Sequence, residues 1–351
     1  MSMFLKQNIR FILNLLRYKL TGRRFPAHVA ISVTNRCNLH CTYCFARYNS
    51  HEKADIPTER MIALIDELSD MGTRLINLTG GEPLVRNDIK QIIDYCTLKK
   101  GIKCSLSTNG LLLENKIDVL KNISSINISL DGNEKQHNRN RGKQDYQKVI
   151  KAIELAVKNH IPVSTCTVIN KYNADCVDEI VKLAKEKDFL AIFHFPYGRL
   201  KLKENENLHP LSPKETKQVV QKIINYKKAG YPIYYSFKTH EYIRDWPFKQ
   251  PSRLLLKKDQ IKDKNFNIIP CLAGDLYCFI DASGYVYPCT VLCGQIKVKN
   301  FLKVGFRKAW DYLPKTRCKA CVFFFQNELN LLLGLNISVW RNFIKNTRIL
   351  H

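Results

Sequence analysis

Three cysteines, Cys37, Cys41 and Cys44, lie within one short stretch of the chain, NRCNLHCTYCF. Cysteine thiolates bind zinc and iron-sulfur clusters, and a structural zinc or an electron-carrying cluster normally takes four protein ligands. The next cysteine, Cys96, is far along the chain. Three thiolates in one loop therefore predict a 4Fe-4S cluster with one iron open to a further ligand. His40 lies between two of the cysteines, so a zinc site completed by a histidine also fits these residues.

A glycine-rich motif, Gly80-Gly81-Glu82-Pro83, follows an apolar run that we expect to be a strand. Glycine has no Cβ atom, so the backbone of such a motif can approach a ligand closely. The Glu82 carboxylate can accept hydrogen bonds from an ammonium group. The motif predicts a ligand site at the end of this strand; an ordinary turn with a surface glutamate is the alternative.

A second group of cysteines lies near the C-terminus. Cys271 and Cys289 are followed by a Cys-x2-Cys pair, Cys318 and Cys321. Four cysteines arranged in two pairs are typical of a metal site in which the protein supplies all the ligands. Four thiolates in two groups saturate one metal, and zinc suits this spacing as well as an iron-sulfur cluster does. Cys278 and Cys293 are candidate extra or substitute ligands. Isolated cysteines elsewhere are typical of small core residues: Cys96, Cys104, Cys166 and Cys176.

The elements that must position these groups alternate along the chain. From residue 28 to about 230, short β-branched runs alternate with amphipathic stretches, a pattern typical of repeated β/α units. The expected strands are 28–34, 74–78, 103–107, 125–130, 162–168 and 191–195. The expected helices are 58–71, 89–100, 116–122, 144–159, 174–187 and 212–229. Parallel strands with helical crossovers predict a barrel or an open α/β sheet, with chemistry at the carboxyl ends of the strands.

The C-x3-C-x2-C spacing, together with Gly80-Gly81-Glu82-Pro83, resembles the radical S-adenosylmethionine (SAM) superfamily. The resemblance implies an α/β fold, the partial (β/α)6 TIM-like barrel of that family. It also implies that the open iron binds the amino and carboxylate groups of SAM. Electron transfer then cleaves SAM to a 5′-deoxyadenosyl radical, which abstracts a hydrogen from the substrate.

The same resemblance assigns cofactor contacts to residues that follow the strands. In the family an arginine pairs with the SAM carboxylate, as its planar guanidinium allows, and Arg141 fits that position best, with Arg139 second. Tyr43 and Phe45 are expected to pack around the cluster and the adenine. Strand-end caps and a solvated basic loop are the alternative for the polar residues. The expected cofactor-binding residues are Gly80, Gly81, Glu82, Pro83, Ser107, Asn109, Ser129, Asp131, Arg141 and Tyr43.

The second cysteine group resembles the twitch domain, a shortened form of the SPASM extension, in which one auxiliary 4Fe-4S cluster lies below the substrate. We therefore expect a small C-terminal cysteine-rich SPASM/twitch domain, with the choice of four ligands among six cysteines left open. Asp281-Ala-Ser-Gly284 within it predicts a β-hairpin turn. The predicted domains are an N-terminal amphipathic basic helix (1–26), the radical SAM core (27–235), a linker (236–270), the auxiliary domain (271–325) and a C-terminal apolar and basic helix (326–351).

The chain of 351 residues carries 56 Lys+Arg against 31 Asp+Glu, a formal net charge of +25. Such a charge attracts phosphates, anionic lipid and nucleic acid. No appended nucleic-acid module is recognisable, so nucleic acid is not the expected partner. The N-terminus lacks the apolar block and cleavage site of a signal peptide. Thirteen cysteines, several in metal-ligand spacings, favour a reducing cytoplasm.

Both ends of the chain are apolar and basic. Residues 3–20 predict an amphipathic helix, and the apolar run from Cys321 to Trp340 is followed by Arg341, Lys345 and Arg348. Helices of this kind lie at the surface of anionic membranes or dock onto the core of their own protein. Peripheral attachment to the inner membrane face is therefore one expectation for either end.

The sequence predicts a radical SAM enzyme of oxidoreductase or carbon-centred bond-forming type, which requires SAM and an electron donor such as flavodoxin or ferredoxin. We expect the auxiliary cluster to assist oxidation or bond formation in a biosynthetic pathway, on a small-molecule, sugar-nucleotide or lipid-linked substrate. Peptide maturation is the alternative; only 27 residues precede the first expected strand at His28, which disfavours it. A non-catalytic zinc- or nucleic-acid-binding protein is the alternative of another class.

Overall fold

The computed structural model describes residues 3–44, 55–142, 145–196, 208–247, 254–255, 266–314, 318 and 320–349. Phe45, which the resemblance places near the cluster, lies outside them. The chain forms two compact units, which are described separately. The first comprises Met1–His40, Ala46–Asn127 and Leu272–Thr316, and the second comprises Cys41–Phe45, Ile128–Cys271 and Arg317–His351. The residues of the predicted auxiliary domain are shared between the two units.

The first unit contains strands in the order β3-β2-β1-β8-β9. The parallel strands are β1 (His28–Ser32), β2 (Leu75–Thr79), β3 (Lys103–Thr108) and β8 (Tyr277–Ile280). β9 (Val286–Tyr287) runs antiparallel to β8 through the predicted hairpin turn, where Gly284 has φ 87°. Only glycine adopts this left-handed conformation at little cost. A strand from the cysteine-rich C-terminal segment thus pairs directly with β1.

Helices cover one face of these strands. α2 (Thr58–Met71) buries Met61, Leu64 and Leu68, and it ends at Gly72, whose φ of 89° suits a glycine C-cap. The predicted helix at 116–122 is a short 3-10 turn, and the one at 89–100 changes from α to π geometry after Asp94. The other helices of this unit are α1 (Met3–Thr21), η1 (Pro83–Val85), α3 (Ile89–Asp94), η2 (Tyr95–Lys99), η3 (Ile117–Leu120), η6 (Thr290–Leu292), α9 (Phe301–Val304) and α10 (Phe306–Asp311).

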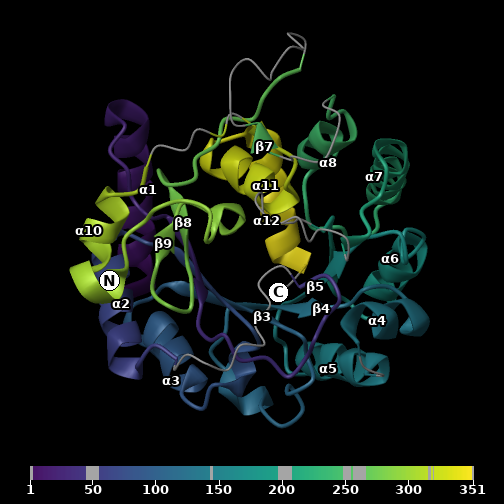
Figure 1. The fold of residues 1–351 in the computed structure, drawn as a ribbon, viewed down its shortest axis with the longest axis horizontal. Helices are drawn as coiled ribbons and strands as arrows, with labels where there is room; N and C mark the ends of the chain where they lie inside the picture. The colour runs from purple at the N-terminus through teal and green to yellow at the C-terminus, as the bar shows by residue number, and fades with distance from the viewer. Residues whose placement is uncertain are drawn as a thin grey trace. The chain divides into compact units, whose positions relative to one another are not determined.

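In the second unit, β5 (Val163–Val168) pairs in parallel with β6 (Leu190–His194). β4 (Ser125–Ser129) follows in the strand order β6-β5-β4 and contains the boundary between the units. α5 (Tyr146–Lys158) and α6 (Val177–Glu186) lie along one face of β5 and β6 (Figure 1). The short strands β7 (Leu254–Leu255) and β10 (Ala320–Cys321) form a separate antiparallel pair. The helices are α4 (Glu134–Arg141), α5 (Tyr146–Lys158), α6 (Val177–Glu186), α7 (Pro213–Lys228), α8 (Phe237–Arg244), α11 (Phe324–Leu333) and α12 (Ile337–Ile349).

The side chains of the inner strands alternate between complete and partial burial. In β2, Ile76 and Leu78 are fully buried, whereas Asn77 is half-buried; in β3, Leu106 is fully buried and Ser107 half-buried. Successive side chains of a strand point to opposite faces of the sheet. The apolar face therefore packs under helices, and the polar face is only partly covered.

The C-terminal apolar run belongs to the core of the second unit. Phe324 and Leu331 of α11 pack in one cluster with Tyr235 and Ile243, the latter from α8. The expectation that this run lies on a membrane is wrong for α11, because its apolar side chains fill the core. The segment 236–270, which the sequence predicts to be a linker, begins with helix α8, a helix that was not predicted.

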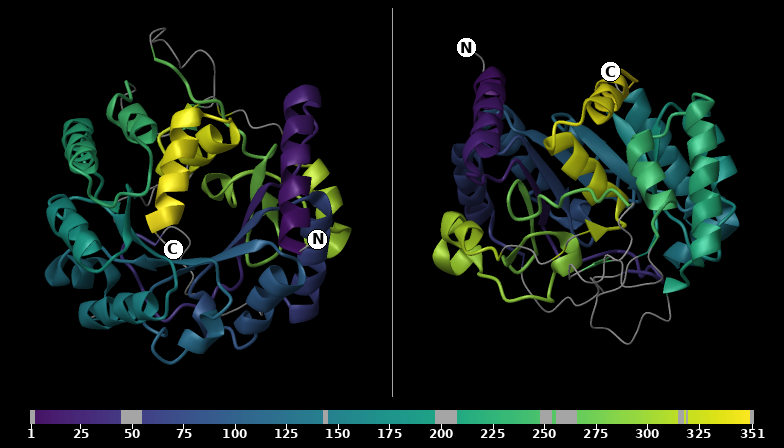
Figure 2. Two further views of the ribbon diagram at one scale, coloured as in Figure 1. Left: turned by 180° about the vertical axis from the view of Figure 1, so that it is seen from behind. Right: turned by 90° about the horizontal axis from the view of Figure 1, so that it is seen from above.

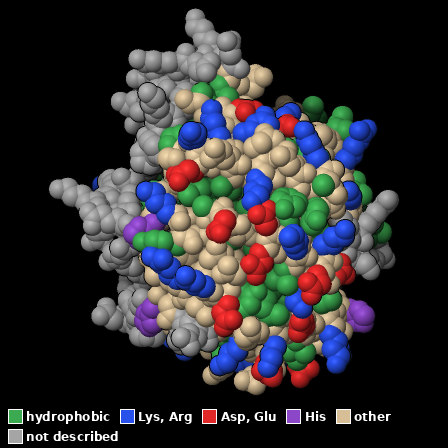
Figure 3. All heavy atoms as spheres, turned by 90° about the vertical axis from the view of Figure 1, so that its right-hand side faces the viewer, with side chains coloured by type: hydrophobic (Ala, Val, Ile, Leu, Met, Phe, Trp, Pro, Cys, Tyr) green, Lys and Arg blue, Asp and Glu red, His purple; other side chains and the backbone are tan. Residues whose placement is uncertain are grey.

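Among the described residues, no helix combines the length and apolarity needed to cross a membrane. The face drawn in Figure 3 carries lysines and arginines intermixed with carboxylates. Ion pairs occur on the second unit, including Lys222 with Asp178 and Lys187 with Glu154. Part of the positive charge of that unit is therefore balanced by neighbouring carboxylates.

Candidate cofactor and metal site

The Glu82 carboxylate is buried just after β2, with 1% of the residue exposed. Its Oε1 accepts hydrogen bonds from the Thr108 hydroxyl (2.8 Å) and the Leu84 amide (3.1 Å). Its Oε2 accepts from the Asn109 amide at 2.7 Å. Neutral donors of this kind orient a carboxylate without cancelling its charge. Glu82 is thus a fixed acidic group where β2 and β3 end.

The glycines before Glu82 bring this loop against the start of the cysteine loop. The Gly81 amide donates to the Thr34 carbonyl and the Glu82 amide to the Arg36 carbonyl, both at 2.9 Å. A Cβ atom at Gly81 would lie 2.1 Å from the Arg36 oxygen and 3.1 Å from the Cys37 Cβ. Glycine is required here because the Arg36 carbonyl, next to Cys37 in the chain, occupies the place that a Cβ atom would take.

The other predicted residues of the first unit lie at the end of β3 and in η1. Asn109 Nδ2 donates to Asn38 Oδ1 at 2.7 Å, which links β3 to the cysteine loop. Ser107 Oγ is 3.5 Å from Asn77 Oδ1 on the half-buried polar face, and Pro83 begins η1 and is buried. The motif and Asn109 therefore converge on the backbone that carries Cys37.

Arg86 is a positioning residue that the sequence reasoning missed. Its buried guanidinium donates to the Val33 carbonyl (2.8 Å) and the Ile56 carbonyl (3.0 Å), and it pairs with Asp88 at 2.5 Å. Since β1 ends at Ser32, Arg86 fixes the chain where it enters the cysteine loop. The Arg-x-Asp spacing just after the glycine motif was the available signal.

In the second unit, Asp131 and Arg141 form a buried ion pair next to Cys41. Arg141 Nε donates to Asp131 Oδ2 at 2.8 Å, and Arg141 Nη1 lies 3.7 Å from Cys41 Sγ. The Tyr43 hydroxyl donates to the same carboxylate oxygen at 2.5 Å, and the Val168 amide donates to Asp131 Oδ1 at 2.9 Å. Three predicted residues, Tyr43, Asp131 and Arg141, thus gather around one cysteine.

Burial and neighbouring charges act in opposite directions on this cluster. Burial lowers the pKa of Arg141, but the charges of Asp131, Tyr43 and Cys41 outweigh it and raise that pKa well above its usual value. Burial raises the pKa of Cys41, and Arg141 opposes that rise. The guanidinium is therefore a permanent cation that favours a negatively charged sulfur.

Helix α4, which carries Arg141, was not expected from the sequence. Asn133 begins it with a capping box, because its side chain accepts from the Gln136 amide and the Gln136 side chain accepts from the Asn133 amide, both at 3.0 Å. The helix spacing separates the two candidate arginines. Arg141 is buried, whereas Arg139 is exposed and stacks on the Tyr172 ring at 3.4 Å. Ser129, at the end of β4, is half-buried.

The expected auxiliary ligands are divided between the units, with Cys271, Cys318 and Cys321 in the second and Cys289 in the first. Burial raises the pKa of Cys318 to about 11, and the charge of Cys271 adds to the effect. These two thiols are therefore close enough to interact.

The two extra cysteines differ in their surroundings. Cys278 is a buried residue of β8, paired in register with Val29 of β1. Cys293 is only partly buried and packs against a small apolar cluster that contains Phe279 and Tyr287. Cys278 thus has the surroundings of a core residue.

None of the thirteen cysteines, all of them within the described residues, forms a disulfide. In the part of the chain that the structure describes, no three histidine, cysteine or carboxylate side chains converge to hold a metal ion. The donor set nevertheless suits an iron-sulfur cluster, with three thiols on one loop, a glycine cradle at Cys37 and a cation at Cys41. Hydrogen bonds and charges at ligand sulfurs are known means of tuning such clusters.

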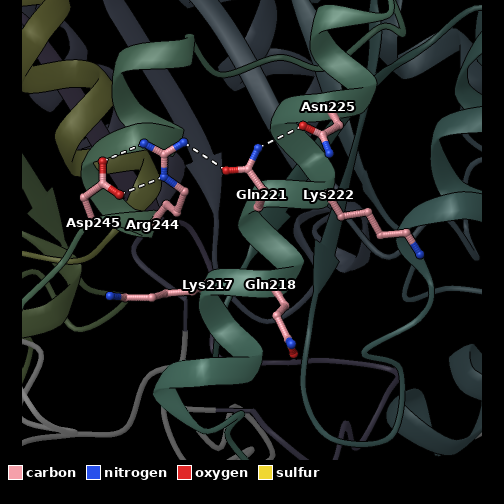
Figure 4. Close-up of a pocket in the computed structure, with 7 residues that line it drawn as sticks. All are labelled: Lys217, Gln218, Gln221, Lys222, Asn225, Arg244 and Asp245. Atoms are coloured by element: carbon pink, nitrogen blue, oxygen red, sulfur yellow. Dashed lines mark hydrogen bonds and ion pairs between the residues drawn. The ribbon is translucent and has the colours of Figure 1, made fainter.

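A polar pocket between α7 and α8 is separate from these residues. Four of its lining side chains bond in a row: Arg244 pairs with Asp245 at 2.7 Å and donates to Gln221, which donates to Asn225 (Figure 4). No predicted site residue lines it. Four of its seven lining residues are thus bonded to one another, and Lys222 pairs instead with Asp178, outside the pocket.

Comparison with known proteins agrees with this geometry. The family model of the radical SAM superfamily matches residues 31–184. The GTP 3′,8-cyclase of Campylobacter jejuni (strain RM1221) is 32% identical over 232 residues, covering 61% of this chain and 70% of that protein. The chain belongs to the radical SAM superfamily. Membership makes it an enzyme that uses SAM and a 4Fe-4S cluster, and it sets aside the non-catalytic alternative.

This radical SAM enzyme is similar to relatives over most of its length. The AdoMet-dependent heme synthase of Methanosarcina barkeri (strain Fusaro) is 27% identical over 318 residues, covering 85% of this chain and 89% of that protein. The structure of anSMEcpe with bound AdoMet matches with a TM-score of 0.63 at 18% identity, covering 93% and 99% of the two chains. Streptococcus suis SuiB bound to S-adenosylmethionine matches with a TM-score of 0.65 at 16% identity, covering 84% and 68%. The predicted fold class is confirmed.

Proposed function

We propose that Cys37, Cys41 and Cys44 hold a 4Fe-4S cluster whose open iron binds SAM. When bound, the cluster and SAM supply the 5′-deoxyadenosyl radical that abstracts a hydrogen from the substrate. The observation that carries the proposal is that two motifs reach the cysteine loop. The glycine motif bonds to its backbone beside Cys37, and Arg141 lies against Cys41.

The residues around the loop then have distinct roles. Glu82 accepts hydrogen bonds from the SAM ammonium group, a role that suits a carboxylate held in place by Thr108, Leu84 and Asn109. Arg141 pairs with the SAM carboxylate or with the Cys41 sulfur, and Asp131 holds its guanidinium in place. Asn109 orients the cysteine loop through Asn38. Ser107 and Ser129 offer hydroxyl groups to the ribose, and Tyr43 packs beside the cluster.

An auxiliary 4Fe-4S cluster is the second part of the proposal, with Cys271, Cys289, Cys318 and Cys321 as ligands. The interaction between Cys271 and Cys318 supports it, and the place of Cys278 within β8 favours a core role for that residue. The auxiliary cluster accepts or passes on an electron, which suits oxidation or bond formation.

A small-molecule substrate is favoured over a peptide. A relative matched over most of both chains is named a heme synthase, whereas the likeness to SuiB, which has been solved with a precursor peptide, is one of fold. A peptide substrate remains the second candidate. A cytoplasmic electron donor such as flavodoxin or ferredoxin completes the system.

Metal content after anaerobic reconstitution tests the two-cluster proposal. We expect about eight irons per chain, since each 4Fe-4S cluster holds four, and about four in a Cys318→Ala/Cys321→Ala variant. Adding SAM should change the electron paramagnetic resonance spectrum of the reduced cluster in both proteins. Zinc in place of iron at the second group, with four irons in the parent chain, would contradict the auxiliary cluster and leave the SAM site standing.

A further inference from the structure

Helix α1 turns an apolar stripe away from the protein. Its outward side chains are large and exposed by 41–85%: Leu5, Ile9, Ile12, Leu13, Leu16 and Leu20. Large apolar side chains gathered in this way on a surface mark an interaction site. Figure 2 shows α1 as one long purple helix at the N-terminal end of the chain.

The opposite face of α1 is held to the first unit mainly by polar contacts. Gln7 Nε2 donates to Ser69 Oγ (2.7 Å), and Arg10 Nη1 donates to the Ser69 carbonyl (2.9 Å). Further along, Asn14 Nδ2 donates to the Met71 carbonyl (3.2 Å) and Tyr18 donates to Asp275 (3.2 Å). These bonds fix the rotation of the helix about its axis. The apolar stripe is therefore held outward by the fold.

Basic side chains border the stripe on both sides. At 100° per residue, Lys6 and Arg17 follow one edge of the stripe and Lys19 the other, and all three are exposed. No aspartate or glutamate occurs among residues 1–51. This helix thus differs from the face in Figure 3, where both signs of charge are mixed.

We propose that α1 docks in the plane of an anionic lipid surface, with the stripe among the acyl chains and the basic side chains at the head groups. An apolar face bordered by lysine and arginine is typical of interfacial helices, since their long stems reach up to the phosphates. Pairing with a second copy of α1 is disfavoured, because it would bring the same basic borders together without an acidic partner on the helix. The proposal does not depend on the catalytic assignment.

Vesicle sedimentation of the full chain tests this docking. With vesicles of phosphatidylcholine and phosphatidylglycerol the protein should sediment, and with phosphatidylcholine alone it should bind far less. A Leu13→Gln/Leu16→Gln variant should bind these vesicles at least about tenfold more weakly, because it can no longer bury two leucine side chains among the acyl chains. The matched control is Leu98→Gln, since Leu98 is 58% exposed and Leu13 is 59% exposed. It should bind like the parent.

A Lys6→Gln/Arg17→Gln/Lys19→Gln variant separates charge from apolar burial. It should lose the preference for phosphatidylglycerol, and higher salt should weaken the parent in the same way. Circular dichroism should show every variant folded, because each substituted side chain is exposed. Equal binding of the Leu13/Leu16 variant and the parent would overturn the proposal. The proposal would also be overturned if the parent chain bound neither kind of vesicle but formed a dimer, and the Leu13/Leu16 variant were monomeric.

Discussion

Glu82 and Asp131 are both buried carboxylates placed just after a strand, yet they are held by different partners. The Thr108 hydroxyl and two backbone amides hold Glu82. The Arg141 guanidinium holds Asp131 at 2.8 Å, with the Tyr43 hydroxyl on the same oxygen. The printed partners of Glu82 are thus neutral donors, whereas Asp131 forms an ion pair that positions Arg141 beside Cys41.

The largest expected effect comes from removing the charge of Asp131. Asp131→Asn leaves the Arg141 cation buried without its counterion, which costs about 3–5 kcal/mol in the free energy of unfolding. Urea denaturation of the purified chain measures it. The matched control is Asp245→Asn, whose Arg244 partner is partly exposed and whose own side chain is 56% exposed, with an expected cost under about 1 kcal/mol. If both substitutions lowered the free energy of unfolding by the same amount, the Asp131–Arg141 pair would be no more important to stability than an exposed ion pair.

Removing the charge of Glu82 should act on the ligand more than on the fold. Glu82→Gln keeps the shape of the side chain but replaces the carboxylate with a neutral amide, so it removes the negative charge proposed to attract the SAM ammonium group. The Kd for SAM should rise by about 10- to 100-fold, the worth of one hydrogen bond to a charged group. Isothermal titration with the reconstituted protein measures the Kd.

Glu67→Gln is the control for that experiment. Glu67 also accepts two backbone amides, those of Phe306 (3.2 Å) and Arg307 (3.0 Å), but it does not contact the cysteine loop. Its SAM affinity should match the parent. A Glu82→Gln variant with unchanged affinity would show that Glu82 is only a structural clamp between β2 and β3.

The smallest effect concerns the second donor on Asp131. Tyr43→Phe removes one buried hydrogen bond but leaves the ion pair with Arg141, so it should cost about 1 kcal/mol in the free energy of unfolding. Tyr95→Phe, which removes a similar bond to the half-exposed Asp66, should cost less. If Tyr43→Phe were as costly as Asp131→Asn, the ion pair would not be the main stabilising contact of Asp131.

The rule that strand ends converge in a parallel α/β fold predicted contacts with the cysteine loop, and each unit can be compared with it by itself. In the first unit the glycine motif and Asn109 contact residues 34–38, and in the second Asp131 and Arg141 lie beside Cys41. The partners of the two carboxylates did not follow, because they depend on side chains from neighbouring elements. Thr108 and Leu84 are ordinary residues with no motif of their own.

The two ends of the chain also show what the sequence could not predict. Both have apolar and basic sequences, but Phe324 of α11 is 1% exposed whereas Leu13 of α1 is 59% exposed. Helical periodicity predicts that one face is apolar and cannot say whether that face turns inward. Gln7 and Asn14 anchor α1 to the first unit, and the sequence analysis did not identify either of them as an anchor.

Formation of 5′-deoxyadenosine tests the central claim most directly. The parent chain, reconstituted without oxygen and supplied with SAM and dithionite, should release 5′-deoxyadenosine, and so should Cys96→Ala, which removes a buried thiol outside the loop. Cys41→Ala should release none above the background without protein. Release by Cys41→Ala at the rate of the parent would contradict the assignment of the loop as the radical-generating site.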